Sequence, residues 1–435
     1  MSGARTKKPA APPIEYSLLL TATLCLLAFG AVMVFSASSA RSLLNTGGNG
    51  FYYLERTLAF GAIGLVVMRI AAVRGVAAAR VLTPVILLSS LFLLFAVLLP
   101  GIGTTVNGSQ RWVGGGLVQF QPSELAKIAL VLYGAYLLSS EPKRARTLAG
   151  LGPYLLVVGL SVALIAKEPD LGTAIVLSFA VCCVLFLAGV RPRTLAPVGA
   201  VIAIVGIGMI ATHPYQEARL TGFLHPGTDT SGSGFQAKQA TIAVGSGGIF
   251  GVGLGESVQK ASYLPEAHTD MIAAVIGEEL GLAGMFVLVG LFGMFGYAGL
   301  RAAHRARDRF SKLVAAGLTS LIMAQAALNL FAVLGLAPLT GVPLPFVSYG
   351  GTSLILTLAA TGLILNVARR PAQAAARGSR RGGRATAAGP ARLRVVEGGT
   401  NTRRKRAASG TSRDSGRRHG GARRTSDRRR RRASR

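Results

Sequence analysis

The sequence is poor in charged residues, in cysteine and in tryptophan. Charged side chains make up 15% of the 435 residues and only 17 residues are acidic, whereas soluble domains carry about 25% charged residues. The three cysteines, Cys25, Cys182 and Cys183, lie in apolar stretches, which argues against a disulfide framework. With 51% apolar residues and a mean hydropathy of +0.49, the composition predicts a membrane protein rather than a soluble enzyme.

Long apolar runs dominate the chain up to residue 368. A helix that crosses a membrane needs about 20 consecutive apolar residues, so these runs predict an all-α polytopic membrane protein with about ten spans. The predicted spans lie near 15–36, 57–73, 82–99, 123–139, 150–166, 171–189, 195–212, 271–300, 313–335 and 350–368. The chain then divides into an N-terminal segment at 1–14, a ten-helix membrane domain at 15–368 and a basic tail at 369–435.

The lysines and arginines between the predicted spans indicate how the chain crosses the membrane. Cytoplasmic loops carry an excess of these residues, and every second loop of this chain does so, beginning with Arg74 and Arg80. Both termini are therefore expected in the cytoplasm. Two outer segments, near 101–122 and 213–270, are too long to be simple connections and are expected to be partly re-entrant or interfacial.

Most of the net charge of +30 lies in the tail. From Arg369 onward there are 23 basic and 3 acidic residues, a difference of +20. A segment so basic, with few large apolar residues, is expected to be disordered and cytoplasmic. Near a membrane it is expected to bind anionic lipid headgroups, at about 1 kcal/mol per basic residue; no specific nucleic-acid partner is expected.

The strongest candidate site is the cluster Glu266, His268 and Asp270, directly before the span that begins near Met271. Ionisable groups at the edge of a membrane are costly and usually functional, and these groups can transfer protons. Their i, i+2, i+4 spacing in an extended loop is an alternative site for a divalent cation such as Mg²⁺ or Mn²⁺. Because no further ligand is evident, no metal or other cofactor is assigned.

Other candidate residues lie in or beside the outer segments. Arg111 is in the first long segment, and Glu124 and Lys127 share one face of the helix that follows. These two form either a local ion pair or part of a cavity. Glu168 and Asp170 belong to a short charged hairpin, which is either a solvated turn or part of a site.

The second long outer segment surrounds a glycine-rich stretch at 245–255 with cationic and amide side chains, among them Arg219, Gln236 and Lys260. No strand precedes the glycines, so they are not a dinucleotide fingerprint. Cations and amides facing outward suit an anionic, sugar-bearing ligand such as a pyrophosphate. Ser348 lies before the last predicted span, in a proline-shaped turn or in the outer wall of the same cavity.

Five segments in this order, 107–127, 168–173, 236–255, 263–281 and 341–353, resemble the SEDS family of shape, elongation, division and sporulation proteins. The similarity extends from about residue 32 to the end of the last span, and 258–270 is more like the FtsW branch than the RodA branch. The chain departs from the family pattern at His225, at Ser262 and at 55–57, which weakens the assignment to one branch.

The resemblance implies the SEDS fold and a peptidoglycan glycosyltransferase that polymerises lipid II at the outer face of a bacterial cytoplasmic membrane. The implied partners are a class B penicillin-binding protein, which is a monofunctional transpeptidase, and other proteins of the division or elongation complex. The implied site has Asp270 at the position of the essential aspartate. Cavity motifs of the family contain Arg111, Glu124, Lys127, Gln236 and Ser348.

On this interpretation Asp270 is the general base, and Lys127, Arg111 or Lys260 lies near the departing pyrophosphate. Two alternatives remain at this point. A lipid II flippase would also have many spans and buried charges, although it would not need a carboxylate at its outer mouth. A non-catalytic scaffold would depend on the basic tail and not on Asp270. A role in elongation rather than division also stays open.

Overall fold

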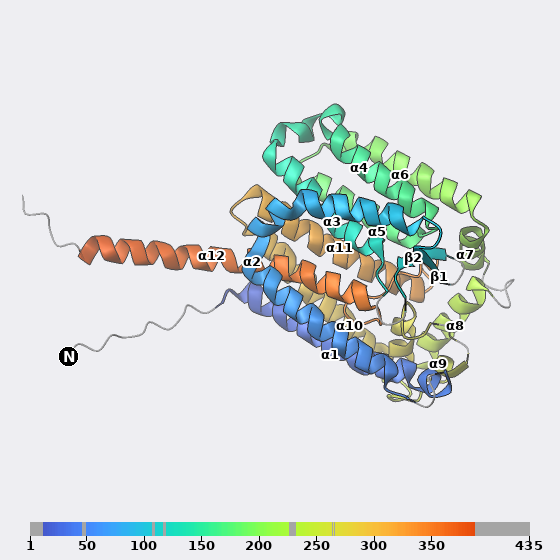
Figure 1. Cartoon of the computed structure of the whole chain (residues 1–435). Helices are drawn as coiled ribbons and strands as arrows, with labels where there is room; N and C mark the ends of the chain where they lie inside the picture. The colour runs from blue at the N-terminus through green and yellow to red at the C-terminus, as the bar shows by residue number, and fades with distance from the viewer. Residues whose placement is uncertain are drawn as a thin grey trace, which may run out of the picture. The chain divides into compact units, whose positions relative to one another are not determined.

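The computed structural model describes residues 12–45, 49–106, 109–115, 119–225, 232–262, 264 and 266–387. One compact unit, Met1–Gly382, holds nearly all of them; the second unit is Gly383–Arg435. The fold is almost entirely helical (Figure 1). The long helices are α1 (Ile14–Asn45), α2 (Tyr52–Val97), α3 (Pro122–Ser140), α4 (Leu148–Lys167), α5 (Leu171–Leu187), α6 (Pro192–Thr212), α10 (Ile272–His304), α11 (Arg309–Val333) and α12 (Gly351–Ala387).

The predicted spans agree with these helices in position. Within the described residues, seven helices are long and apolar enough to cross a membrane, and α5 is a shorter apolar helix. The predicted span 57–73 and most of 82–99 fall in the 46-residue α2. This helix would measure about 69 Å if straight, more than twice the hydrocarbon thickness of about 30 Å. The count of ten spans stays a prediction.

Helix α2 is broken at Gly75, where φ is +74°, and its blue ribbon changes direction about midway (Figure 1). Asn366 of α12 bonds to both sides of the break. Its amide nitrogen donates to the carbonyl of Ala72 at 2.7 Å, and its amide oxygen accepts from the N–H of Val76 at 3.2 Å. The backbone groups freed by the break are thus satisfied inside the protein, as a membrane environment requires.

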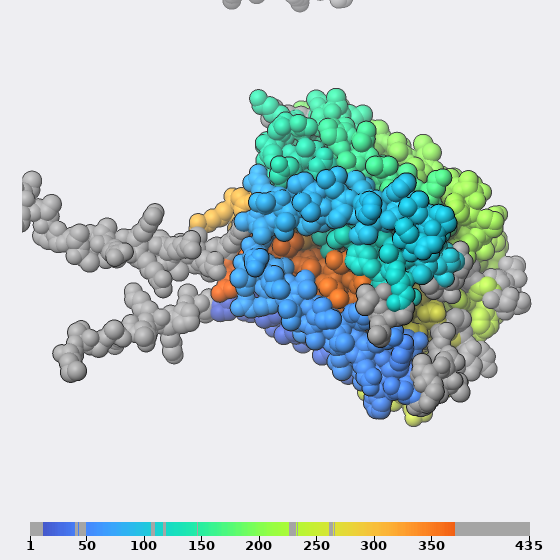
Figure 2. Space-filling model, in the orientation of Figure 1, coloured from blue at the N-terminus to red at the C-terminus, as the bar shows by residue number. Residues whose placement is uncertain are grey.

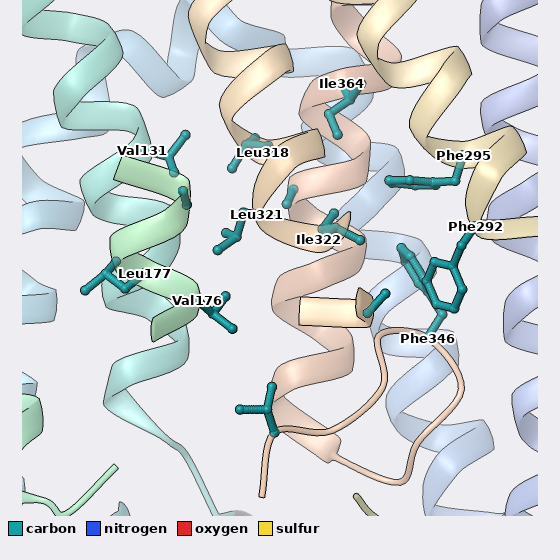
Figure 3. Close-up of a cluster of buried hydrophobic side chains, with 14 of the residues drawn as sticks. Val131, Val176, Leu177, Phe292, Phe295, Leu318, Leu321, Ile322, Phe346 and Ile364 are labelled. Carbon is teal, nitrogen blue, oxygen red and sulfur yellow. The ribbon is translucent and has the colours of Figure 1, made fainter. Parts of the chain in front are cut away.

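The core of the membrane unit lies around α11, which packs against α3, α5 and α10. Figure 3 shows its apolar side chains, with Val131 facing Leu318 on one side and Phe292, Phe295 and Phe346 gathered on the other. A β-carbon on Gly317 of α11 would lie 2.7 Å from side-chain atoms of both Val131 and Val184, so a small residue allows the close approach of helices here, as is usual in membranes.

The predicted outer segments contain short elements of their own. The first holds the antiparallel hairpin β1 (Gly103–Val106) and β2 (Ser109–Val113), with a bulge at Thr104/Thr105. The second holds α7 (Pro214–Leu224), α8 (Ser233–Ser246) and α9 (Gln259–Ser262). A short 3₁₀ helix, η1 (Pro142–Arg146), connects α3 to α4.

The predicted tail begins at 369, inside α12, which continues to Ala387. Residues 388–435 lie outside the described residues, so the predicted disorder and lipid binding of the tail are not tested there.

Candidate functional site

The hairpin, α7, α8, the loops that precede α10 and α12, and the ends of α2, α3, α5 and α12 enclose a cavity of about 910 Å³. Its wall is rich in polar and charged side chains. In the space-filling view the surface is hollowed between the two blue parts of α2, with orange atoms of α12 on the floor (Figure 2). Both helices also contribute residues to the cavity wall, among them Tyr53, Arg56 and Ser353.

Asp270 lies in the cavity wall two residues before α10 begins. Asn329 of α11 donates one amide bond to the carbonyl of Asp270 and one to the carbonyl of Val342, both at 2.8 Å. The backbone that carries the carboxylate is therefore tied to two other elements. Burial raises the pKa of Asp270 to about 6; the charge of Arg219 opposes this shift, and that of Glu266 adds to it. The carboxyl is thus mostly ionised at neutral pH, with a basicity suited to proton transfer.

Three arginines line the cavity: Arg56, Arg111 and Arg219. Arg219 is stacked on Tyr215, with 4.5 Å from its guanidinium carbon to the ring centroid, and donates to the phenol oxygen at 2.5 Å. Arg56 is stacked on Tyr52 at 4.3 Å. An aromatic support orients a guanidinium while leaving other donors for an anion.

Arg219 and Asp270 both lie beside Gly341. A β-carbon on Gly341 would lie 3.4 Å from Nη1 of Arg219 and 3.8 Å from Oδ2 of Asp270. The φ of Gly341 is +71°, a conformation that glycine adopts without steric cost. The cation and the carboxylate therefore border the same small space.

Seven of the eleven predicted site residues line this cavity: Arg111, Glu124, Asp170, Gln236, Glu266, His268 and Asp270. The structure thus brings together residues up to 159 positions apart, from Arg111 to Asp270. The ring of His268 clusters with those of Tyr53 and Tyr349, with centroids 4.3 and 5.6 Å away.

Asp170 is the N-cap of α5. It accepts from the N–H and the hydroxyl of Thr173 at 3.1 and 2.8 Å, and from the amide of Gln121 at 3.2 Å. Its carboxylate is therefore engaged locally and satisfies a free N–H of the first helical turn. Arg111 donates through Nε to the carbonyl of Glu168 at 3.0 Å and through Nη2 to that of Pro169. The charged hairpin is thus part of the cavity wall and not a solvated turn.

Four predicted residues, Lys127, Glu168, Lys260 and Ser348, do not line the cavity. Ser348 accepts a hydrogen bond from the N–H of Leu344 at 2.8 Å and so closes the turn before α12. Lys127 and Lys260 are buried in ion pairs, at 2.7 Å from Glu124 and at 2.7 Å from Glu279. Both charges are neutralised behind the wall.

The pair of Glu124 and Lys127 is extended by two neutral groups. Nζ of Lys127 also donates to the amide oxygen of Gln325 at 2.8 Å, and Oε2 of Glu124 accepts from the hydroxyl of Ser353 at 3.2 Å. The network joins α3, α11 and α12 beneath the cavity, where Glu124 reaches its wall. Both alternatives for this motif thus hold in part: it is a local ion pair, and one member faces the cavity.

The buried carboxyl group of Glu168 is accommodated differently from these ion pairs. Neither of its carboxyl oxygens has a hydrogen-bond partner among the described residues. Burial, helped by the nearby charge of Asp170 and opposed by Arg111, raises the pKa of Glu168 to about 9. This side chain is therefore an uncharged acid at neutral pH.

The extended loop assumed for a metal site is wrong. Residues 266–271 form turns that lead into α10, and the N–H and hydroxyl of Thr269 both donate to the carbonyl of Glu266, at 3.0 and 2.9 Å. The turns begin the helical winding of α10, so the three side chains do not alternate along a strand. Within the described residues no three His, Cys, Asp or Glu side chains form a group that could hold a metal ion.

The sequence analysis did not assign Arg56 or Arg219 to the site. Arg219 was visible only as one cation in a long outer segment; the signal that could have singled it out is Tyr215 one helical turn earlier, a pattern that supports a guanidinium on an aromatic ring. Arg56 follows Tyr52 by the same interval.

Comparison with known proteins gives one family. The family model for cell cycle proteins of the FtsW, RodA and SpoVE type matches residues 16–373. A probable peptidoglycan glycosyltransferase FtsW of Geobacter sulfurreducens is 39% identical over 354 residues, which cover 81% of this chain and 95% of the relative. Stage V sporulation protein E of Bacillus subtilis is 38% identical over 365 residues, which cover 84% and 99%.

Two solved structures have a similar fold. A chain from a peptidoglycan synthase complex that coordinates polymerization and crosslinking matches with a TM-score of 0.67 and 29% identity, covering 81% of this chain and 96% of the other. The rod shape determining protein RodA of Thermus thermophilus matches with a TM-score of 0.57 and 27% identity, covering 81% and 95%.

Proposed function

Because the chain belongs to the FtsW, RodA and SpoVE family of cell cycle proteins and has the activity of a peptidoglycan glycosyltransferase, we propose that it polymerises lipid II during septal wall synthesis. The reaction takes place at the outer face of the bacterial cytoplasmic membrane, and both termini lie in the cytoplasm. One observation carries this proposal: Asp270 and Arg219 both border the space beside Gly341 in a polar cavity.

The chemistry requires one bond to form and one to break. A sugar hydroxyl of the acceptor attacks the anomeric carbon of the donor, and the bond from that carbon to the pyrophosphate breaks with its electron pair on the pyrophosphate oxygen. Asp270 accepts the proton of the attacking hydroxyl. A general base in this position contributes about 10²–10⁴-fold to the rate, and the leaving group is undecaprenyl pyrophosphate.

The cavity arginines stabilise the negative charge that develops on the leaving pyrophosphate. Fixed cations in a cavity lower the energy of a transition state because they need no reorganisation. Arg219 lies close enough to Asp270 for its charge to lower the pKa of that carboxyl, and Arg111 and Arg56 line the same cavity. These residues replace Lys127 and Lys260 in the hypothesis for the pyrophosphate site, since both lysines have buried carboxylate partners.

A divalent cation would find oxygen ligands at Glu266 and Asp270. The hydroxyl of Thr269 lies 3.4 Å from one carboxylate oxygen of each, so the two carboxylates are close neighbours. Mg²⁺ or Mn²⁺ held there would neutralise charge near the pyrophosphate. Titration of activity with EDTA and back-addition of either ion measures whether the reaction depends on one.

A crosslinking partner is part of the proposal. The polymer made here is a substrate for a transpeptidase, and the structural neighbour that coordinates polymerization with crosslinking comes from a complex. We therefore expect a class B penicillin-binding protein beside this chain, together with other proteins of the division complex. Co-purification with the candidate transpeptidase measures this association.

The test is polymerisation of lipid II by the purified protein with its transpeptidase partner, read as glycan ladders on a gel. Wild type should give ladders, and Asp270→Asn should give none, because an amide cannot accept the proton. Glu256→Gln, at an exposed carboxylate of the outer loop, is the matched control and should behave as wild type. Ladders from Asp270→Asn would rule out the base, and no ladders from folded wild type would favour a lipid II flippase.

A further inference from the structure

A buried polar cluster behind the cavity joins α1, the loop that precedes Asp270, and α10. Nζ of Lys260 lies 2.7 Å from Oε1 of Glu279 and donates to the carbonyl of Gly255 at 2.7 Å. Ser36 of α1 donates its hydroxyl to the two carboxylate oxygens of Glu279, at 2.7 and 2.6 Å. None of these side chains lines the cavity, so the cluster needs a role other than contact with substrate.

The neighbouring Glu278 holds the same loop. Its carboxylate accepts from the hydroxyl of Ser257 at 2.5 Å and from the N–H groups of Val258 and Gln259 at 3.1 and 3.4 Å. Hydrogen bonds to an ionised acceptor are roughly twice as strong as neutral ones. Two successive carboxylates of α10 therefore bind consecutive residues of the loop, from Ser257 to Lys260.

The backbone of this loop is also built into α10. Helix α10 is broken at Gly281, where φ is +64°. The N–H groups of Val252 and Gly253 donate to carbonyls before the break, at 3.0 and 3.1 Å, and two N–H groups after the break donate back to the loop at 3.0 Å. A β-carbon on Gly251 or Gly281 would overlap the opposite backbone. Loop and helix thus form one rigid body at this point.

We propose that Lys260, Glu279 and Ser36 are positioning residues that fix Asp270 in the cavity. Lys260 is ten residues before Asp270, and its partner Glu279 lies in the helix that Asp270 precedes. The segment from Lys260 to Asp270 is therefore attached to α10 at both ends: by the ion pair with Glu279 at one end and by the chain itself at the other. The hydrogen bonds of Ser36 connect this attachment to α1. The inference rests on the proposed function, because it assigns these residues to the geometry of the same reaction.

We call Lys260, Glu279 and Ser36 together the clamp. A clamp that positions the general base has a large effect on the rate. Displacement of a reacting group by about 1 Å can lower the rate about 10²-fold. A side chain that positions the base acts on kcat, whereas a cation that binds the pyrophosphate directly also acts on KM. The distinction matters because the sequence analysis placed Lys260 near the pyrophosphate.

The first variant is Lys260→Met, which leaves Glu279 without its cation. We expect kcat for lipid II polymerisation to fall by about 10–10²-fold, with KM for lipid II changed less than about twofold. The same substitution at Lys238, an exposed lysine of α8, is the matched control and should change neither constant.

The second variant is the double substitution Lys260→Met with Glu279→Met. Replacing a buried ion pair by apolar residues is often tolerated, whereas removal of one partner leaves an uncompensated charge. We therefore expect the double variant to be more active than Lys260→Met, a non-additive result that indicates coupling. If Lys260 bound the pyrophosphate, the double variant would be at least as defective as the single one.

The outcomes separate this inference from the proposed function. An inactive wild type would refute the proposed function. An active wild type with normal kcat in Lys260→Met, with a rise in KM alone, or with a double variant as defective as the single one would overturn the clamp. Thermal unfolding midpoints of all variants in detergent identify any that lose activity by unfolding, and the folded double variant then decides the question.

Discussion

Charged side chains are partnered differently in the cavity wall and in the helix interior behind it. In the wall, Arg219 and Asp270 are held close without a hydrogen bond between them in the described structure, and each can act on a ligand. In the interior, Lys127 is paired with Glu124 and Lys260 with Glu279, the Glu278 carboxylate accepts three hydrogen bonds, and Glu168 is protonated. The location of a charge relative to the cavity, and not its residue type, therefore decides whether it can serve substrate or only structure.

Breaking an interior pair should produce the largest effect. Lys127→Met leaves Glu124, which is 4% exposed, as a buried carboxylate without its cation, and this costs about 3–5 kcal/mol of stability. The unfolding midpoint in detergent should fall markedly. The matched control is Lys238→Met, which should leave the midpoint unchanged.

The double variant Glu124→Gln with Lys127→Met should recover part of that stability, because it leaves no unpaired charge. A midpoint for Lys127→Met equal to that of wild type would show that the interior tolerates free charge as the wall does, and the contrast between the two regions would be lost.

Glu168 offers a second test of the interior. The pKa of its carboxyl is about 9 in the folded state and about 4.5 in the unfolded chain, so between these values the folded state binds the extra proton. Stability should therefore be complete below about pH 4.5 and decline as pH rises toward 9, by at most about 1.4 kcal/mol per pH unit. Glu168→Gln should remove this decline and raise the unfolding midpoint at pH 8. If stability declined equally between pH 5 and 9 in Glu168→Gln and in wild type, Glu168 would be ionised in the folded wild type.

Removal of a wall cation should affect kinetics more than stability. If Arg219 stabilises the leaving pyrophosphate as proposed, Arg219→Gln deletes a charge-assisted interaction worth about 1.5–3 kcal/mol, and kcat/KM should fall by about 10–10²-fold. The charge of Arg219 also lowers the pKa of Asp270. Wild-type activity should be half-maximal near pH 6, and the variant should reach half its maximum at a higher pH.

Arg193→Gln, at an exposed arginine at the start of α6, is the matched control for this variant. A loss of stability in Arg219→Gln with an unaltered pH profile would place Arg219 with the interior residues.

Much of this arrangement could be predicted from the sequence. Apolar runs of sufficient length predicted the positions of the long helices. The ordered motifs indicated the family. The cluster of Glu266, His268 and Asp270 indicated one candidate site. The spacing of Glu124 and Lys127 predicted a shared helical face. It could not predict that Lys127 turns toward Gln325 and away from the cavity, because that depends on how α3 is rotated against α11.

The clamp at Lys260 was beyond sequence reasoning for a related reason. The loop before Lys260 has no periodic sequence pattern. It contacts the break at Gly281 through backbone atoms, and the sequence indicates such a contact only by the presence of glycines. The turns at 266–271 likewise follow from the start of α10, so the alternating spacing of three polar residues was a misleading guide to the backbone conformation there.

The smallest effect is expected from replacing a single glycine of the cavity wall by alanine. Gly341 and Gly335 have almost the same backbone conformation, with φ of +71° and +70°, so alanine at either position should cost about 1–2 kcal/mol. Only Gly341 lines the cavity, and its new methyl group would lie beside both Arg219 and Asp270. Gly341→Ala should therefore raise KM for lipid II several-fold, while Gly335→Ala should lose the same stability with unchanged KM. An equal rise in KM in both variants would mean that the space between cation and carboxylate is not where the substrate binds.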